Sequence, residues 1–149
     1  MNALFGSLDF FKTYLKVGKE YKVPVLVPMK LLQDSSFRKA AGDYPALIVE
    51  HIQLHPGIVP DYWQEAYDSA LVNMKPRLNE LVLHLAYNDE EMKAVTIGKA
   101  RWWDAAWRQR DYDYITSERF KDVLRKNNIQ SVTCNQIQKL LYPELWHLC

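Results

Sequence analysis

The sequence predicts an α/β fold in which helices and strands alternate along the chain. Segments with apolar residues at helical spacing take turns with short apolar runs, and only a few residues connect one segment to the next. Such alternation is typical of βα units around a largely parallel sheet. The length of 149 residues suits one domain, and 48% hydrophobic with 25% charged residues excludes disorder and fibrous repeats.

The first part of the chain contains two helical and two strand-like segments. Residues 8–19 have helical apolar spacing behind Ser7, a residue type that caps helices. Residues 23–29 are predicted to be a short buried strand, with its two prolines at the ends or on a sheet edge. Residues 31–41 are predicted to be helical, and residues 46–54, rich in isoleucine and valine, a second strand.

The centre of the chain contains the clearest strand pattern. Pro60 opens a helix whose apolar face continues to Met74. Residues 79–87 then alternate strictly, with leucines at every second position on one face. Asn88 is predicted to cap the next helix, because Glu91 three residues later completes a capping box.

The last part is predicted to continue the alternation. Residues 102–107 are in helical register, Ser117 begins a further helix, and residues 129–133 form the last predicted strand. A βα architecture usually begins with a strand, whereas this chain begins with a helix. One interpretation is that a preceding strand is missing; the other is a topology that starts with a helix.

Charge and cysteine content exclude several classes of function. Nineteen basic and eighteen acidic residues are interspersed and leave a net charge of +1, without the basic stripe that a nucleic-acid surface needs. Cys134 and Cys149 have no partner cluster, which excludes a disulfide framework or a cysteine zinc site. No apolar run approaches the roughly 20 residues of a membrane span, and no secretory signal is visible. We therefore expect a cytoplasmic protein with no nucleic-acid or membrane partner.

His84 is the strongest single candidate for catalysis. It lies late in the clearest strand, and catalytic side chains of parallel α/β sheets gather where strands run into the following loops. A histidine there can act as general acid or base, or bind a metal. The alternative is a structural histidine whose two ring nitrogens bond to the backbone.

Two other groups of residues are weaker candidates. His51 and His55 are four apart, but in a strand they would be more than about 12 Å apart, which disfavours a shared metal. The tryptophans and arginines of residues 101–110 could line a sugar-binding cleft or pack a helix against a sheet. The sequence has no glycine-rich phosphate loop and no G-x-S-x-G motif, so nucleotide binding and serine hydrolysis have no support.

Several runs together resemble the YdjC-like carbohydrate deacetylases, a family that includes chitooligosaccharide and hopanoid-associated deacetylases. The runs are Asn-Glu-Leu-Val-Leu-His-Leu-Ala-Tyr at 79–87, Asp-Glu-Glu-Met at 89–92, Trp-Arg-Gln-Arg-Asp at 107–111 and Thr-Ser at 116–117. The resemblance covers nearly all 149 residues and matches the C-terminal half of the family. It implies the C-terminal part of a distorted (β/α) barrel and the removal of acetyl groups from N-acetylated sugars or oligosaccharides.

The resemblance also implies roles for individual residues. In the family a divalent metal, Mg²⁺ or Zn²⁺, activates water for attack on the amide carbonyl. His84 matches the strand-end histidine that protonates the leaving amine or stabilises the oxyanion. Arg110 and Trp107 are expected to bind substrate, and Glu80 has a supporting role.

Departures from the family pattern lead to a narrower expectation. The aspartate and two histidines that hold the metal in the family would lie before Met1, Arg77 replaces a turn glycine, and Cys134-Asn135 replaces a Trp-Arg pair. We therefore expect residues 1–149 to be one incomplete deacetylase domain that binds no metal alone. The ligands could come from an upstream polypeptide, and a homodimer is open. The alternative function is a non-catalytic α/β interaction domain.

Overall fold

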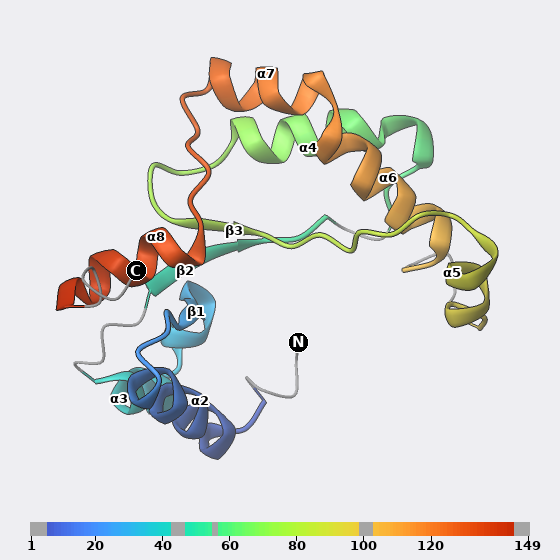
Figure 1. The fold of residues 1–149 in the computed structure, drawn as a ribbon. Helices are drawn as coiled ribbons and strands as arrows, with labels where there is room; N and C mark the ends of the chain where they lie inside the picture. The colour runs from blue at the N-terminus through green and yellow to red at the C-terminus, as the bar shows by residue number, and fades with distance from the viewer. Residues whose placement is uncertain (1–5, 43–46, 55–56, 99–102, 145–149) are drawn as a thin grey trace. The chain divides into compact units, whose positions relative to one another are not determined.

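The computed structural model describes residues 6–42, 47–54, 57–98 and 103–144 (Figure 1). The chain divides into two compact units: residues 1–51 with 131–149, and residues 52–130. Each unit has its own hydrophobic cluster. The prediction of a single domain over residues 1–149 stays a prediction.

The first unit contains helices that share one apolar cluster with the first strand. Its elements are α2 (Leu8–Glu20), β1 (Leu26–Pro28), the 3-10 helix η1 (Met29–Gln33), α3 (Ser35–Ala41), β2 (Leu47–Ile52, whose last residue belongs to the second unit) and α8 (Cys134–Leu141). The helix at residues 8–19 is confirmed, and it buries Phe11, Leu15 and Gly18, which are spaced four and three residues apart. Gly42 ends α3 with a φ of +50°, a conformation that glycine adopts without a steric penalty.

Strands β1 and β2 pair in parallel, with Leu26 opposite Leu47 and Pro28 opposite Val49. Pro28 is the last residue of β1, which confirms that this proline lies at a strand end. The three strands follow the order β1-β2-β3, where β3 is Asn79–Leu81. The α/β class is therefore confirmed, while the barrel stays a prediction.

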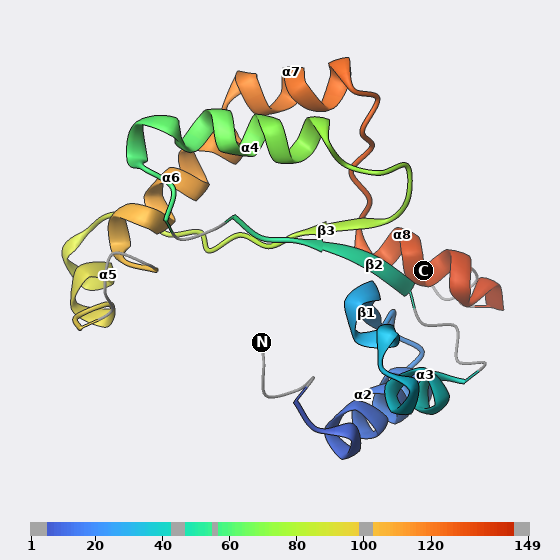
Figure 2. The ribbon, with the colours of Figure 1, turned by 180° about the vertical axis from the view of Figure 1, so that it is seen from behind.

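The second unit contains the short strand β3 and a group of helices. Its helices are η2 (Pro60–Tyr62), α4 (Trp63–Val72), α5 (Glu90–Val95), α6 (Ala105–Thr116) and α7 (Glu118–Lys126). Figures 1 and 2 show α4 and α7 side by side, with α6 next to them. The core of this unit is mostly aromatic: Leu54, Trp63, Tyr67, Leu71, Trp107 and Tyr114.

Three local predictions were wrong in detail. The strand predicted at 79–87 ends at Leu81, and residues 129–133, predicted to be a strand, are not one. The helix after β3 is capped by Asp89 rather than Asn88, because the Asp89 carboxylate accepts a hydrogen bond from the backbone N–H of Met92. Helix α8 was not predicted, although Thr133 and Gln136 form a complete capping box at its start.

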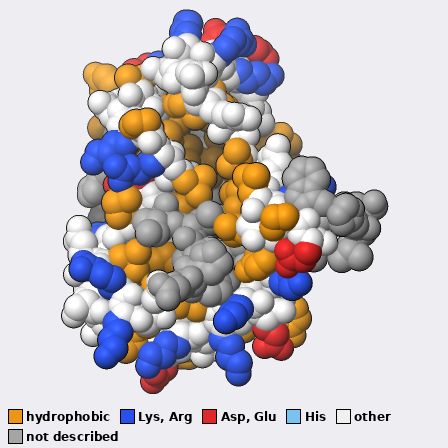
Figure 3. All heavy atoms as spheres, turned by 90° about the vertical axis from the view of Figure 1, so that its left-hand side faces the viewer, with side chains coloured by type: hydrophobic (Ala, Val, Ile, Leu, Met, Phe, Trp, Pro, Cys, Tyr) orange, Lys and Arg blue, Asp and Glu red, His pale blue; other side chains and the backbone are white. Residues whose placement is uncertain are grey.

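In the part of the chain that the structure describes, no helix is both long enough and apolar enough to cross a membrane. On the face shown in Figure 3, lysine and arginine side chains are scattered among hydrophobic and acidic ones.

Candidate functional site

His84 lies in an extended segment, residues 82–88, that follows β3 and runs along helix α6. The backbone N–H groups of alternate residues in this segment donate to acceptors of several kinds. Val82 donates to the carbonyl of Ile52 at 2.9 Å, as a strand residue would. His84 donates to Asp111 Oδ2 at 2.8 Å, and Asn88 donates to Gln109 Oε1 at 2.8 Å.

Helix α6 therefore occupies the place of a neighbouring strand along this segment. The backbone N–H of Ala86 lies 3.5 Å from the carbonyl oxygen of Arg108, and the hydroxyls of Tyr87 and Tyr112 are 2.9 Å apart. Because these acceptors belong to a helix, the backbone of residues 82–88 stays extended without forming a longer β-strand. Buried backbone donors need partners of some kind, and here the helix supplies them.

Asp111 is the polar centre of this region. The residue is 1% exposed, and its Oδ1 accepts a 2.5 Å hydrogen bond from the hydroxyl of Tyr67. Burial raises the pKa of Asp111, while hydrogen bonds from Tyr67, from the His84 backbone and from the Trp107 side chain oppose that rise. The carboxyl group thus ties α4, α6 and the backbone at His84 together.

The His84 ring packs against Trp103. Their ring centroids are 4.2 Å apart in an edge-on arrangement, and Trp103 has a φ of +80°. This conformation is rare for a bulky residue and costs about 1–3 kcal/mol. The Arg108 Nε group donates to the carbonyl of Trp103 at 3.2 Å, which helps to hold that backbone in place.

The His84 imidazole is suited to proton transfer or hydrogen bonding. Its Nδ1 atom is buried and has no hydrogen-bond partner among the described residues. Burial lowers the pKa of His84, the positive charge of Arg108 lowers it further, and the negative charge of Asp111 opposes both. The ring is therefore mainly neutral at pH 7, when it can accept a proton on one nitrogen and donate a hydrogen bond from the other.

The other predicted site residues lie in different surroundings. Trp107 is 3% exposed, and its ring packs edge-on against Trp63 at 4.3 Å. Glu80 lies in β3 and is half-buried. Arg110 lies on α6, with its guanidinium 5.8 Å from the centre of the Trp63 ring. The roles of Trp107 and Arg110 in substrate binding and the supporting role of Glu80 stay predictions.

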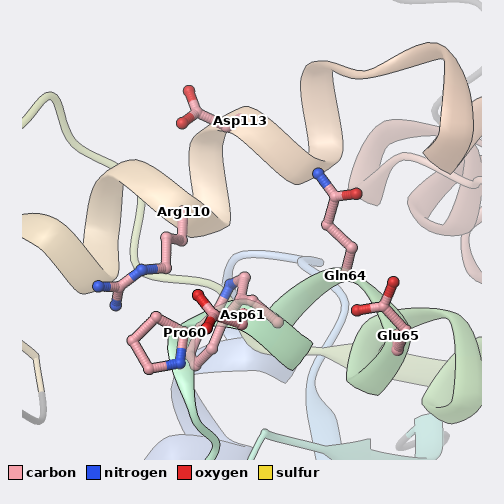
Figure 4. Close-up of a pocket in the computed structure, with 7 residues that line it drawn as sticks. Pro60, Asp61, Gln64, Glu65, Arg110 and Asp113 are labelled. Carbon is pink, nitrogen blue, oxygen red and sulfur yellow. The ribbon is translucent and has the colours of Figure 1, made fainter.

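Arg110 also lines a pocket of about 380 Å³ between α6 and the start of α4 (Figure 4). Its lining consists of Pro60, Asp61, Trp63, Gln64, Glu65, Arg110 and Asp113. Sequence reasoning did not find this pocket, because no local pattern relates α6 to residues 60–65.

The structure describes only one histidine of the weaker candidate pair. His51 lies in β2 and is half-buried, whereas His55 and His147 lie outside the described residues. Residues 101 and 102 of the tryptophan and arginine group also lie outside them.

Sequence reasoning also missed Asp111 and Tyr67. One signal for Asp111 was available: with Trp107 and Tyr114 it forms a spacing of four and three residues, which puts a carboxylate on the buried face of a helix. Buried carboxylates need hydrogen-bond partners, so this position predicts a polar contact inside the core.

The described residues do not fit the divalent metal that the family resemblance implies. Within residues 6–42, 47–54, 57–98 and 103–144, no three His, Cys, Asp or Glu side chains are grouped so that they could hold a metal ion.

The fold and site together define an α/β protein with one candidate catalytic histidine, anchored by a buried carboxylate. The family model described as YdjC-like protein matches residues 7–126. The chain therefore belongs to the YdjC-like family, as the sequence runs predicted. A comparison with curated proteins gave no significant match.

Proposed function

We propose that this chain functions in a metal-dependent carbohydrate deacetylase, which hydrolyses the N-acetyl group of a sugar to acetate and a free amine. The observation that carries the proposal is the His84 ring, held on an anchored backbone after β3 with its Nδ1 atom unpartnered among the described residues. Buried polar side-chain atoms with a purely structural role are as a rule hydrogen-bonded. Membership of the YdjC-like family supports the carbohydrate deacetylase theme.

His84 has two roles in this proposal, and both follow from its protonation state. As a neutral imidazole it donates a hydrogen bond to the oxygen that becomes negatively charged when water adds to the amide carbonyl. After taking up the proton that the attacking water releases, it gives that proton to the amine nitrogen as the carbon–nitrogen bond breaks. The lowered pKa favours the first role at neutral pH.

Asp111 keeps the His84 backbone in place for either role. Because Asp111 is buried, a shift of His84 away from α6 would leave Oδ2 of this carboxylate without its backbone donor, although Oδ1 would still be bonded to Tyr67. Such a loss costs about 1–3 kcal/mol per unpaired group. Fixed geometry of this kind is what catalytic groups require.

A divalent metal would supply the activated water in this reaction. In the proposal its ligands come from outside the described residues, including those of a partner polypeptide. Mg²⁺ and Zn²⁺ are the candidates that the family resemblance implies, and an N-acetylated sugar or oligosaccharide is the proposed substrate.

Acetate release from N-acetylglucosamine oligomers tests the proposal. The 149-residue chain is assayed alone and after co-expression with the N-terminal half of a YdjC-like protein, with Zn²⁺ or Mg²⁺ added. We expect release by the combined chains, loss on chelation, and a decrease of at least about 100-fold in His84→Gln. His51→Gln, a half-buried histidine in β2, is the matched control and should keep its activity.

Two results would contradict the proposal. One is no acetate release from any combination in which the two chains co-purify with bound metal. The other is full activity in His84→Gln, which would make His84 a structural residue. The first result would favour the alternative of a non-catalytic interaction domain.

A further inference from the structure

The Tyr67 hydroxyl on α4 connects that helix to the backbone of His84 through Asp111. It donates to Asp111 Oδ1 at 2.5 Å, and the backbone N–H of His84 donates to Oδ2 of the same carboxyl group at 2.8 Å. Three parts of the chain that are far apart in sequence therefore meet at one buried group: α4, α6 and the extended segment that contains His84. The chemistry proposed at His84 does not itself use this hydroxyl.

The geometry at Asp111 fits the ionised carboxylate. Both of its oxygens face donors, and an ionised carboxylate accepts hydrogen bonds at both, whereas a protonated carboxyl group has to donate from one of them. The distance of 2.5 Å to the Tyr67 hydroxyl is also in the short range that is typical of O–H···O⁻ bonds. The surrounding donors are therefore arranged to hold a negative charge.

Burial acts against that charge, and Tyr67 acts for it. Removal from water raises the pKa of Asp111, which is 1% exposed. Hydrogen bonds from Tyr67 and from the His84 backbone lower the pKa again, and the Tyr67 bond has the larger effect. Tyr67 itself stays protonated, because burial and its bond to the neighbouring carboxylate raise the pKa of its hydroxyl. It therefore remains a donor to Asp111.

The charge of Asp111 acts on the His84 ring. Burial and the positive charge of Arg108 lower the pKa of His84, and the Asp111 carboxylate opposes them. Because the same carboxylate accepts from the His84 backbone, it influences both the position and the proton affinity of this histidine. A change at the Tyr67 hydroxyl therefore reaches His84 through Asp111.

We propose that Tyr67 is a positioning residue for His84, because its hydroxyl holds the buried Asp111 carboxylate in the ionised form that accepts from the His84 backbone. The contact between α4 and α6 then controls the proton affinity of a residue that lies on neither helix. The consequence for catalysis rests on the proposed function, whereas the effect of Tyr67 on the titration of His84 does not.

NMR titration of the 149-residue chain tests this proposal without an enzyme assay. The carboxyl carbon signal of Asp111 and the ring signals of His84 are followed as the pH is changed. In the unmodified chain we expect Asp111 to be ionised at neutral pH. In Tyr67→Phe, Asp111 should take up a proton at a higher pH, and the pKa of His84 should fall, because less negative charge opposes the effects of burial and Arg108.

The matched control is Tyr114→Phe. Tyr67 and Tyr114 are both 1% exposed and their rings stack at 4.5 Å, but the Tyr114 hydroxyl donates to Asp68 Oδ1 at 2.7 Å. Loss of this hydroxyl should leave the titrations of Asp111 and His84 unchanged. Asp111→Asn removes the charge but keeps the shape of the side chain, so the pKa of His84 should fall there too. Tyr67→Phe should cause no further fall in that background.

Acetate release by the combined chains measures the consequence for catalysis. We expect Tyr67→Phe to lower kcat about tenfold while KM stays nearly unchanged, since the hydroxyl acts on a catalytic group and not on the substrate. The limb of the pH profile that His84 controls should move to lower pH in this variant. Tyr114→Phe should change neither the rate nor the profile.

Four results would overturn the role of Tyr67. They are a protonated Asp111 at neutral pH in the unmodified chain, an unchanged His84 pKa in Tyr67→Phe, equal changes in the two tyrosine variants, and an unchanged kcat and pH profile in Tyr67→Phe. The first needs no variant, so it applies even where a variant does not fold.

These outcomes are distinct from failure of the proposed function. Acetate release that depends on His84, together with unchanged titrations in Tyr67→Phe, overturns the role of Tyr67 alone. The expected titrations without acetate release from the metal-loaded chains overturn the deacetylase alone.

Discussion

The two units bury different kinds of side chain. The core of the first unit contains Phe11, Leu15, Val25 and Val27, none of which has a polar group. In the second unit, the hydroxyls of Tyr67 and Tyr114 reach the carboxylates of Asp111 and Asp68.

The first unit is therefore held by apolar packing, whereas the second combines apolar packing with buried hydrogen bonds. An apolar core gains stability from burial alone and tolerates substitutions of similar volume. A core with buried carboxylates needs every hydrogen bond in place, since an unpaired group costs more than a typical bond contributes. The second unit, which contains His84, accordingly has the stricter demands on geometry.

The largest effect is expected in the apolar core. Phe11→Ala removes a fully buried ring and should lower the free energy of unfolding by about 3–5 kcal/mol. Phe10→Ala, one residue earlier and 59% exposed, should change it by less than about 0.5 kcal/mol. Denaturant unfolding followed by circular dichroism measures both. Similar losses in the two variants would show that the first unit has no such core.

A smaller effect with a different character is expected in the polar core. Asp111→Ala leaves the Tyr67 hydroxyl and the His84 backbone N–H without their acceptor, so we expect a loss of about 3 kcal/mol. The control is Asp113→Ala, an exposed carboxylate on the same helix, with an expected loss below about 0.5 kcal/mol. The amide NMR signal of His84 should shift in the first variant only. An unchanged signal in Asp111→Ala would contradict the contact.

The smallest effect concerns the protonation of His84. Because burial and Arg108 lower its pKa in the folded chain, an NMR titration should give a value below 6.5. A lowered pKa means that the neutral ring stabilises the fold above pH 6.5, and that this contribution is lost as the pH falls through the folded-state pKa.

His84→Gln cannot titrate, so its stability should depend less on pH in that window than the stability of the unmodified chain. Unfolding of both proteins at about pH 7.5 and 5.5 measures the difference. A His84 pKa above 6.5 would mean that Asp111, rather than burial, dominates the surroundings of the ring.

Local patterns predicted the elements whose hydrogen bonds are local or follow ordinary strand pairing. Helix α2 follows from its apolar spacing, and β1 and β2 follow from short runs that bury Val27 and Val49. The segment after β3 was misread for a physical reason. Its alternating leucines fit a strand, but the acceptors for its N–H groups come from Asp111 and Gln109, more than twenty residues later.

The candidate site was predictable only in part. His84 was identified from its position after a strand, and the family from the order of several short runs. The contacts that define its surroundings, with Asp111 and Trp103, depend on how α6 docks. No pattern within a few residues encodes that docking. The pocket at Arg110 was missed for the same reason.

The replacement of a strand by α6 has a consequence for amide hydrogen exchange. In a regular sheet, protection of alternate amides reports on the pairing of two strands. Here the amides of His84, Ala86 and Asn88 are protected by groups on α6, so their exchange reports on the attachment of that helix. These three amides should therefore exchange together when α6 detaches, independently of Val82, whose acceptor is Ile52.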